Sequence, residues 1–374
     1  MRIVDEGTVV SSAPGTEHQS CTFPGICVLP NGRWLVGFRA APAKLSVAGQ
    51  SACFTWSDDS GATWTPPASP FPPPEPGGKP GRNRTLHPTA LGGSRVLATL
   101  CWVDSSDPSL PFFNETTQGL LDTRVFHALS TDNGESWSQP VPMDTAVFGV
   151  PCPTTGPTLV LADGEWACQF ELNKHYHDTA PWRHASVLMF SNDQGGTWPG
   201  HVVASTDPEN RFFYWDQRPA LLSDGRVLNV FWTYDSLNAA YVNIHARLGS
   251  PDARTWTPLW DIGLPGQPAP PVHLPDGRIA LVYVDRTAAP IIKLRTSPDD
   301  GATWPGDTEL VIARPELPSQ NAHKTSMQDA WAEMGRFSIG LPATALTPDG
   351  HLLVVYYSGP DTDETDIKWA RIAP

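Results

Sequence analysis

Six arginines stand beside apolar runs that recur along the whole chain. They are Arg39, Arg84, Arg183, Arg218, Arg286 and Arg336. A guanidinium group holds a carboxylate through two parallel hydrogen bonds, so arginines that converge on one place make a site for an anion. Their alternative role is to pair with nearby acids such as Asp216 and Asp285. From this set we expect Arg39, Arg84, Arg218 and Arg336 to bind an acidic substrate.

Carboxylates occupy the same kind of position. Seven of them precede or follow an apolar run: Asp104, Asp107, Glu171, Asp216, Asp235, Asp285 and Glu333. Cleavage of a glycosidic bond needs one group that protonates the leaving oxygen and a second group that attacks the sugar or activates water. We expect Asp104, Glu171 or Asp216 to be the proton donor and Asp285 to contact the substrate.

Histidine and tyrosine add further candidates. His87 directly precedes Pro88 at the start of one apolar run, and Tyr234 ends another. An imidazole near an arginine-lined site can transfer a proton near neutral pH. We therefore expect His87 or Tyr234 to assist the proton donor.

The segment 175–184 is rich in histidine. His175 and His177 would project to one side of a strand, which is compatible with a divalent metal, and a solvated loop is the other interpretation. We expect His175 to contact the substrate, and we expect neither a metal nor a cofactor.

An eight-residue pattern decides the fold that must position these side chains. Ser-x-Asp-x-Gly-x-(Thr/Ser)-Trp occurs at 57–64, 130–137, 191–198 and 297–304, and a shortened copy occupies 250–256. The Asp carboxylate can accept bonds from backbone N–H groups, Gly can adopt a positive φ, and the Trp can anchor the turn on a neighbouring unit. Recurrence of one pattern indicates an array of similar units.

A second repeat counts the units. A Pro, an apolar run, a Gly-containing turn and a second apolar run recur at 24–38, 88–102, 157–170, 219–234, 271–284 and 342–357. Asn-Gly or Asp-Gly between apolar runs predicts a hairpin, here an inner and a second strand. A third strand, such as 125–129 or 291–295, leads into the eight-residue turn, and a fourth follows it.

The sequence therefore predicts an all-β fold, a six-bladed β-propeller of four-stranded antiparallel blades in one domain that spans 1–374. The last unit ends at 367–372 on its third strand, and we expect the N-terminal run 2–10 to add the missing strand and close the ring. In this fold the ends of the second strands and the approaches to the inner strands share one face. The arginines, acids and His87 should meet there, around the central axis.

The eight-residue pattern resembles the Asp-box, or bacterial neuraminidase repeat, of the sialidase superfamily. The resemblance implies the same propeller and a glycosidase site on that face, where sialidases use a tyrosine nucleophile beside a glutamate. Three motif positions depart from the family. Thr22-Phe23-Pro24 replaces Arg-Ile-Pro, the segment 39–50 holds no acid, and 335–340 holds no tyrosine.

Composition narrows the partners and the location. The formal net charge of −14 argues against nucleic acid and acidic membranes. No run approaches the roughly 18 apolar residues of a membrane span. The N-terminus lacks the apolar core of a signal peptide, so we expect a cytoplasmic protein or a secreted one whose signal has been removed.

Cysteine and proline add two smaller expectations. Cys27, Cys53, Cys101 and Cys168 fall in predicted strands as buried thiols, whereas Cys21 and Cys152 are expected in loops, where one disulfide is an option. The proline-rich stretch 66–80 should form an extended connection between blades one and two.

The sequence predicts an exo-acting glycoside hydrolase that cleaves a terminal acidic sugar from an oligosaccharide or glycoconjugate. Two alternatives remain open. A polysaccharide lyase would use histidine and tyrosine to act on a uronate-containing glycan, and a non-catalytic propeller would bind a glycan or a protein without turnover.

Overall fold

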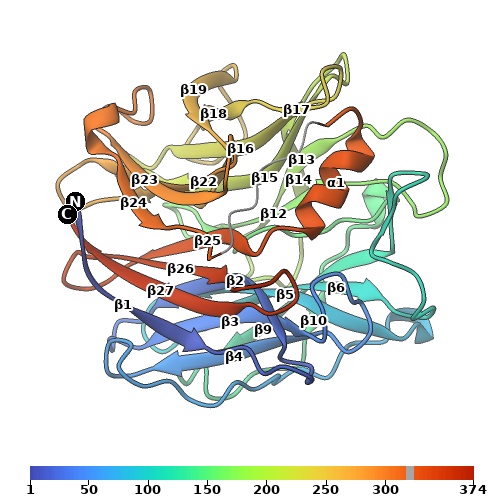
Figure 1. Cartoon of the computed structure of the whole chain (residues 1–374), viewed down its shortest axis with the longest axis horizontal. Helices are drawn as coiled ribbons and strands as arrows, with labels where there is room; N and C mark the ends of the chain where they lie inside the picture. The colour runs from blue at the N-terminus through green and yellow to red at the C-terminus, as the bar shows by residue number, and fades with distance from the viewer. Residues whose placement is uncertain (317–323) are drawn as a thin grey trace.

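The repeats fold into a ring of blades around a central axis (Figure 1). The computed structural model describes residues 1–316 and 324–374. Within that part of the chain six antiparallel sheets form the ring. Five are built from strands that follow one another in the sequence, the sixth joins the N-terminal strand to the last three, and blades that are neighbours in the sequence pack side by side. The prediction of a six-bladed propeller is confirmed.

The first three blades run from the axis outward in chain order. Blade one contains β2 (Ser20–Val28), β3 (Trp34–Ala41) and β4 (Ser51–Ser57); blade two contains β5 (Gly81–Ala90), β6 (Val96–Asp104), β9 (Thr123–Ser130) and β10 (Val141–Pro142); blade three contains β11 (Leu159–Val160), β12 (Trp166–Leu172), β13 (Ala185–Ser191) and β14 (Gly200–Thr206).

The other three blades follow the same scheme. Blade four contains β15 (Phe212–Leu221), β16 (Val227–Asp235), β18 (Asn243–Gly249) and β19 (Trp260–Pro265), with β17 (Ala240–Tyr241) beside β16; blade five contains β20 (Gln267–Pro268), β21 (Val272–His273), β22 (Ile279–Asp285), β23 (Ile291–Ser297) and β24 (Leu310–Ala313); blade six contains β25 (Ile339–Leu346), β26 (Leu352–Ser358), β27 (Asp366–Ala373) and β1 (Arg2–Val10). Prolines 268, 270 and 271 explain why the inner strand of blade five is split, because proline donates no ladder hydrogen bond.

The two ends of the chain close the ring. β1 pairs antiparallel with β27 from Arg2 opposite Ala373 to Val10 opposite Ile367. Figure 1 accordingly shows the N and C marks side by side. The predicted closure by the N-terminal strand is confirmed.

Blade one departs from the predicted four strands. After β4 the chain makes only an isolated bridge between Phe54 and Ala68, and no fourth strand forms among the described residues. The prolines of 66–80 cannot donate to a ladder. This stretch packs along the edge instead: Phe71 is buried, and the Trp102 indole donates to the Pro74 carbonyl at 2.8 Å.

The eight-residue patterns form four nearly identical turns. In the first, the Asp59 carboxylate accepts bonds from the Ser57 hydroxyl and from the Thr63 N–H, both at 2.8 Å, and the Thr63 hydroxyl donates to it at 2.6 Å. Gly61 has φ of +92°, and the residue before it, Ser60, also adopts a positive φ. The predicted turn chemistry is confirmed.

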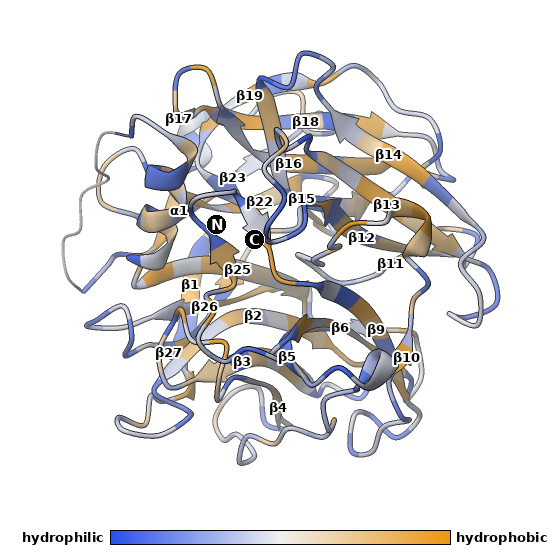
Figure 2. Ribbon diagram, turned by 90° about the vertical axis from the view of Figure 1, so that its right-hand side faces the viewer, coloured by the Kyte–Doolittle hydropathy of each residue, from blue (hydrophilic) through white to orange (hydrophobic). Residues whose placement is uncertain are grey.

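The tryptophans of these turns pack against the preceding blade. Trp137 of blade two stacks on Phe54 of blade one with ring centroids 4.7 Å apart, and Trp304 of blade five joins a core cluster with Leu228 of blade four. Figure 2 shows that the apolar residues lie mainly on the strands of the blades and that the loops are more hydrophilic. The core is therefore a set of layers between blades.

Two insertions rise beside the ring. One follows β6 and carries the small hairpin β7 (Phe113–Asn114) and β8 (Gly119–Leu120), and the other carries helix α1 (Met327–Gly335) before β25. The sequence analysis did not predict α1. The Ser326 hydroxyl caps it by accepting from the Asp329 N–H at 3.2 Å, a spacing typical of a helix start.

All six cysteines are buried free thiols. The suggested disulfide between Cys21 and Cys152 is therefore absent, and Cys21 lies in strand β2 rather than in a loop.

Candidate active site

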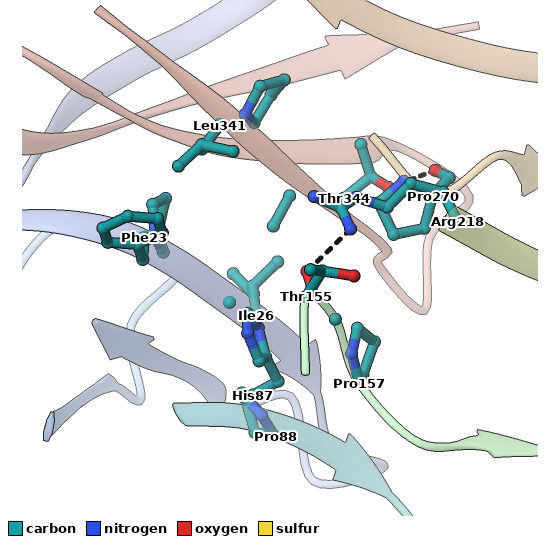
Figure 3. A pocket seen from close by; sticks show the side chains of 15 residues that line it. Phe23, Ile26, His87, Pro88, Thr155, Pro157, Arg218, Pro270, Leu341 and Thr344 are labelled. Carbon is teal, nitrogen blue, oxygen red and sulfur yellow. Dashed lines mark hydrogen bonds between the residues drawn. The ribbon is translucent and has the colours of Figure 1, made fainter. Parts of the chain in front are cut away.

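The residue before each repeated proline faces the axis. These six residues are Phe23, His87, Gly156, Arg218, Pro270 and Leu341, and they line a narrow space of about 40 Å³ (Figure 3). Each of the six blades thus contributes the residue at the same position of the repeat. Only His87 and Arg218 bring chemically active side chains to this axial ring.

A larger cavity of about 310 Å³ adjoins the axial ring and shares Phe23, His87, Thr155, Arg218 and Leu341 with it. Its other walls come from the ends of second strands and the approaches to inner strands, together with the insertion after β6 and α1. The sequence analysis expected the chemistry on this face, which we call the top face.

A bulge in β15 places two charged side chains in the cavity. The pairing of β15 with β16 shifts register between Trp215 and Arg218, and Asp216 has φ of +49°. A non-glycine residue in this region costs about 1–3 kcal/mol and needs local support. The Glu171 carboxylate supplies it by accepting a hydrogen bond from the Asp216 N–H.

Polar side chains from three blades form a continuous network along one wall. His184 Nε2 lies 3.4 Å from Glu171 Oε2, and Glu171 in turn holds the backbone of Asp216. Gln267 donates to Asp216 Oδ2 at 2.5 Å and accepts from Arg286 Nη2 at 2.8 Å. The network therefore runs from blade three through blade four to blade five.

Burial changes the proton affinities of the two central groups. It raises the pKa of Asp216, an effect that the Glu171 charge reinforces and that Arg218, Gln267 and Arg286 oppose. Burial and the nearby Arg218 charge lower the pKa of His87 to about 3. At neutral pH His87 is thus a neutral imidazole, and Asp216 holds its proton to a higher pH than an ordinary carboxyl group.

Arg218 is positioned by backbone carbonyls. Its Nη1 donates to the Thr155 carbonyl at 2.7 Å, the bond drawn in Figure 3, and to its neighbour Gln217 at 3.2 Å. Its Nη2 lies 3.7 Å from Asp216 Oδ1. The guanidinium therefore stands beside the carboxyl group at the base of the cavity.

Lys44 and Tyr357 lie beside Arg286. The buried Lys44 ammonium donates to the carbonyls of Phe337 and Met334 and lies 3.3 Å from the Tyr357 hydroxyl. Burial lowers the pKa of Lys44 well below its ordinary value and raises that of Tyr357 to about 12. Lys44 holds the carboxyl end of α1 against the cavity.

Aromatic rings make up most of the remaining wall. Those that line the cavity are Phe23, Phe112, Phe113, Trp182, Trp215, Trp232, Trp331, Phe337 and Tyr357. Trp331 of α1 stacks on Phe113 of β7 with centroids 4.0 Å apart. This contact joins the two insertions beside the cavity.

The structure brings five of the predicted site residues together. His87, Glu171, Asp216, Arg84 and Arg218 all line the cavity. Each stands at the end of a second strand or at the approach to an inner strand, as the repeat register predicts.

Asp104 and Asp285 end their strands outside this lining. Asp104 lies 3.6 Å from Lys79, and Asp285 lies 2.9 Å from Lys293. Successive side chains of a strand point to opposite faces, so Arg286 faces the cavity where Asp285 does not.

Arg39 and Tyr234 are buried away from the cavity. The Arg39 guanidinium binds Gln50 Oε1 at 2.7 Å and the carbonyls of Lys44 and Ser46, so it holds the 44–50 loop. Tyr234 stacks on Trp215 at 5.0 Å behind the wall, and burial raises its pKa to about 12.

His175 and Arg336 are exposed. His175 Nε2 bonds the Gly149 carbonyl at 2.8 Å, and Arg336 caps the end of α1. Of the histidines in 175–184, only His184 is buried, beside Glu171. Among the described residues, no group of three or more His, Cys, Asp or Glu is placed to hold a metal ion.

The sequence analysis missed Lys44, Gln267 and Tyr357, and it did not select Arg286 from its six arginines. Tyr357 and Arg286 end second strands, so the same repeat position that indicated Glu171 carried a signal for both. Lys44 and Gln267 lie outside the repeated positions, and nothing in the sequence marks them.

No helix in the described residues is both long and apolar enough to cross a membrane.

Neither a protein-family model nor a curated protein sequence matches the chain. Solved structures match it over nearly its full length. A Dyadobacter fermentans protein of unknown function has a TM-score of 0.76 and 19% identity, with 100% of this chain and 99% of that one covered.

Two sialidase-type enzymes are also similar. The Hadza microbial sialidase Hz136 has a TM-score of 0.66 and 15% identity, with 98% of this chain and 69% of that one covered. The leech intramolecular trans-sialidase, solved with 2,7-anhydro-Neu5Ac, has a TM-score of 0.68 and 13% identity, with 99% and 70% covered. This chain therefore has the six-bladed propeller fold of the sialidases.

Proposed function

We propose that this protein is an exo-acting glycoside hydrolase that removes a terminal acidic sugar in the top-face cavity. The observation that carries the proposal is the placement of Asp216 beside Arg218 in that cavity, with their side chains 3.7 Å apart. The guanidinium can hold the acidic group of a sugar while the neighbouring carboxyl group donates a proton.

In this reaction Asp216 protonates the glycosidic oxygen as the bond to the anomeric carbon breaks. Water then adds to that carbon, and its proton passes to a base. His87 lies in the same cavity as a neutral imidazole that can accept this proton. With a pKa of about 3 it is a weak base, which is sufficient because water loses its proton readily once it is bonded to the electron-deficient carbon. Glu171 positions Asp216 through its backbone N–H.

Two features support the choice of substrate. The leech trans-sialidase, which has a similar fold, was soaked with 3'-sialyllactose, a glycan that ends in an acidic sugar. The stack of Trp331 on Phe113 encloses one side of the cavity, which favours the end of a glycan over the middle of a long chain.

The test measures sialic acid released from 3'-sialyllactose by the purified protein and by two variants. We expect Asp216→Asn to lower kcat by about 10²–10⁴-fold, the usual contribution of a general acid, with little change in KM. Asp261→Asn, on the exposed strand β19 of the same blade, serves as the matched control and should keep wild-type kinetics.

The pH profile checks the role of Asp216 separately. Because burial raises its pKa, the protonated acid persists above the ordinary carboxyl range, and kcat should fall as pH rises through that pKa. Wild-type kcat that is unaffected by Asp216→Asn would contradict the assignment. Binding of sialylated glycans without release would instead favour a non-catalytic glycan-binding propeller.

A second candidate is a lyase that acts on uronate-containing glycans. The placement of His87 and Arg218 in one cavity favours it, because an imidazole could remove the proton next to a carboxylate that the guanidinium holds. The C–O bond at the β carbon then breaks and leaves a C=C bond in the product. Appearance of an ultraviolet-absorbing product from a uronate polymer, without water uptake, would identify this reaction.

A further inference from the structure

Two guanidinium groups on the cavity wall form no ion pair with any described carboxylate. Arg286 is buried, and its Nη2 donates to Gln267, while its Nε and Nη1 find no hydrogen-bond partner in the described chain. The one hydrogen bond recorded for the Arg84 side chain is a long one, from Nη1 to Gln50 Oε1 at 3.3 Å. Both side chains line the cavity.

The two groups are mounted in the same way. The Arg84 guanidinium lies 4.1 Å from the ring centre of Phe112, and the Arg286 guanidinium lies 3.6 Å from that of Phe337. An arginine stacked on a ring keeps its N–H edge free for bidentate contact with an anion. Each is therefore held in place by an aromatic ring and not by an ion pair with a described carboxylate.

Their blades are opposite one another. The six blades follow one another around the ring in chain order, so blade two, which carries Arg84, stands across the axis from blade five, which carries Arg286. Arg218 of blade four lies between them at the base. A ligand with one acidic group at each wall would contact both guanidinium groups.

The charged side chains that line the cavity also favour an anionic ligand. Arg84, Arg218, Arg286 and Lys44, whose pKa burial lowers, face the carboxyl groups of Glu171 and Asp216 and the exposed Glu115, in a protein whose net charge is −14. Burial lowers the pKa of Arg84 to about 10, which still leaves it charged at neutral pH. Buried charge without a counter-ion is costly, and a ligand with more than one negative charge would remove that cost.

We propose that the substrate carries two acidic groups, one held by Arg218 and Arg286 and the other by Arg84 on the opposite wall. This inference rests on the proposed function, since it specifies the acidic glycan of the same cavity. The second acidic group belongs either to the terminal sugar itself, as a sulfate ester, or to the sugar next to it, as a second carboxylate.

Binding measurements on the intact protein test this proposal. The probes are free N-acetylneuraminic acid with one acidic group, the same sugar with one O-sulfate, and the disialyl disaccharide with two carboxylates. The disaccharide is measured on Asp216→Asn protein so that it stays intact. We expect at least one of the dianionic probes to bind about 10-fold tighter than the monoanion or better, the scale of one added charge-assisted contact.

Two variants locate the second contact. Arg84→Gln should abolish the preference for the dianion and leave the affinity for the monoanion within about 2-fold, whereas Arg84→Lys should retain part of the preference. Arg82→Gln is the matched control, since Arg82 is exposed on the same strand and lies outside the cavity. Thermal melting of each variant shows that the fold is kept.

The outcomes separate the two proposals. A monoanion that binds as tightly as both dianions, or a dianion preference that survives Arg84→Gln, overturns the two-anion inference and leaves the proposed function standing. Absence of binding by all three probes overturns both. The tighter of the two dianions shows whether the second acid lies on the terminal sugar or on its neighbour.

Discussion

At the scale of single residues, His87 and Arg218 occupy the same position of the repeat and bring different chemistry to the axis. His87 is buried beside Arg218, and its pKa falls from an ordinary 6.5 to about 3. Arg218 donates to two carbonyl oxygens. The axis of the ring therefore carries one neutral base and one cation side by side.

Burial of the neutral His87 makes stability depend on pH. The His87 imidazole takes up a proton near pH 6.5 in the unfolded chain and only near pH 3 in the folded chain. The stability that its neutral form contributes to the folded protein is therefore complete above pH 6.5 and is lost as pH falls toward 3. From pH 7 to pH 5, protonation of this histidine in the unfolded chain should lower the free energy of unfolding by about 2 kcal/mol. His87→Gln should remove this part of the slope in urea titrations.

His177→Gln is the control for that experiment, because His177 is exposed and should leave the slope unchanged. An identical slope in wild type and His87→Gln would show that the imidazole is not buried in its neutral form.

The repeat register explains how far single residues could be predicted. It placed His87, Glu171, Asp216, Arg84 and Arg218 correctly because each stands at a fixed distance from a repeated proline or strand end. It failed for Asp285 and Asp104, since facing direction changes with every residue of a strand and depends on local register. Arg39 and Tyr234 pack away from the cavity, and the repeat carries no information about such packing.

At the scale of elements, the four turns of the Asp-box pattern are small networks around one carboxylate. Asp132 accepts from the Ser130 hydroxyl at 2.7 Å and from the Ser136 N–H at 2.9 Å, and the Ser136 hydroxyl also donates to it. These bonds lower the pKa of Asp132 to about 2. The turn is thus built around the ionised acid.

Asp132→Ala should lower the melting temperature by several degrees, because the turn loses three hydrogen bonds to a charged acceptor. Asp252→Ala is a matched comparison in the shortened fifth copy, where the recorded bonds to the carboxylate come from Ser250 and Arg254, and it should cost less. Equal losses would contradict this account of the turn. Since the folded pKa lies below the ordinary 3.8, the contribution of Asp132 is present above about pH 4 and lost as pH falls through 2.

Two elements differ from the prediction: helix α1 and the outer edge of blade one. The capping pair of Ser326 and Asp329 was readable, but α1 is short and is held by contacts with Lys44 that are distant in sequence. The repeat also suggested a fourth strand for blade one. The prolines of 66–80 override it, because they cannot supply ladder hydrogen bonds.

At the scale of the whole molecule, the ring depends on one pairing between the ends of the chain. β1 covers the edge of β27, and Gly7 lies against the Trp369 ring so closely that a Cβ would approach its Nε1 to 2.8 Å. Six blades were predictable because six copies of one repeat divide the chain evenly. The closing strand was predictable because the last copy lacked its fourth.

Deletion of residues 1–10 should open the ring. The edge of β27 and its apolar neighbours would then be exposed, so we expect a large loss of melting temperature and concentration-dependent association. Leu237→Ser, which changes an exposed side chain far from the closure, should leave both unchanged. A truncated protein that melts like the wild type would show that the first blade and the last hold the ring without β1.

The narrowness of the axial ring closes the centre of the propeller to a sugar that lies in the top-face cavity. About 40 Å³ at the axis accommodates a water molecule or two and no sugar, so nothing of that size can drain through the centre of the propeller. A sugar that enters on the top face must therefore also leave on that face. The product therefore has to leave the cavity before water and a new substrate can enter. Slow release of the product would limit turnover as much as cleavage of the bond does.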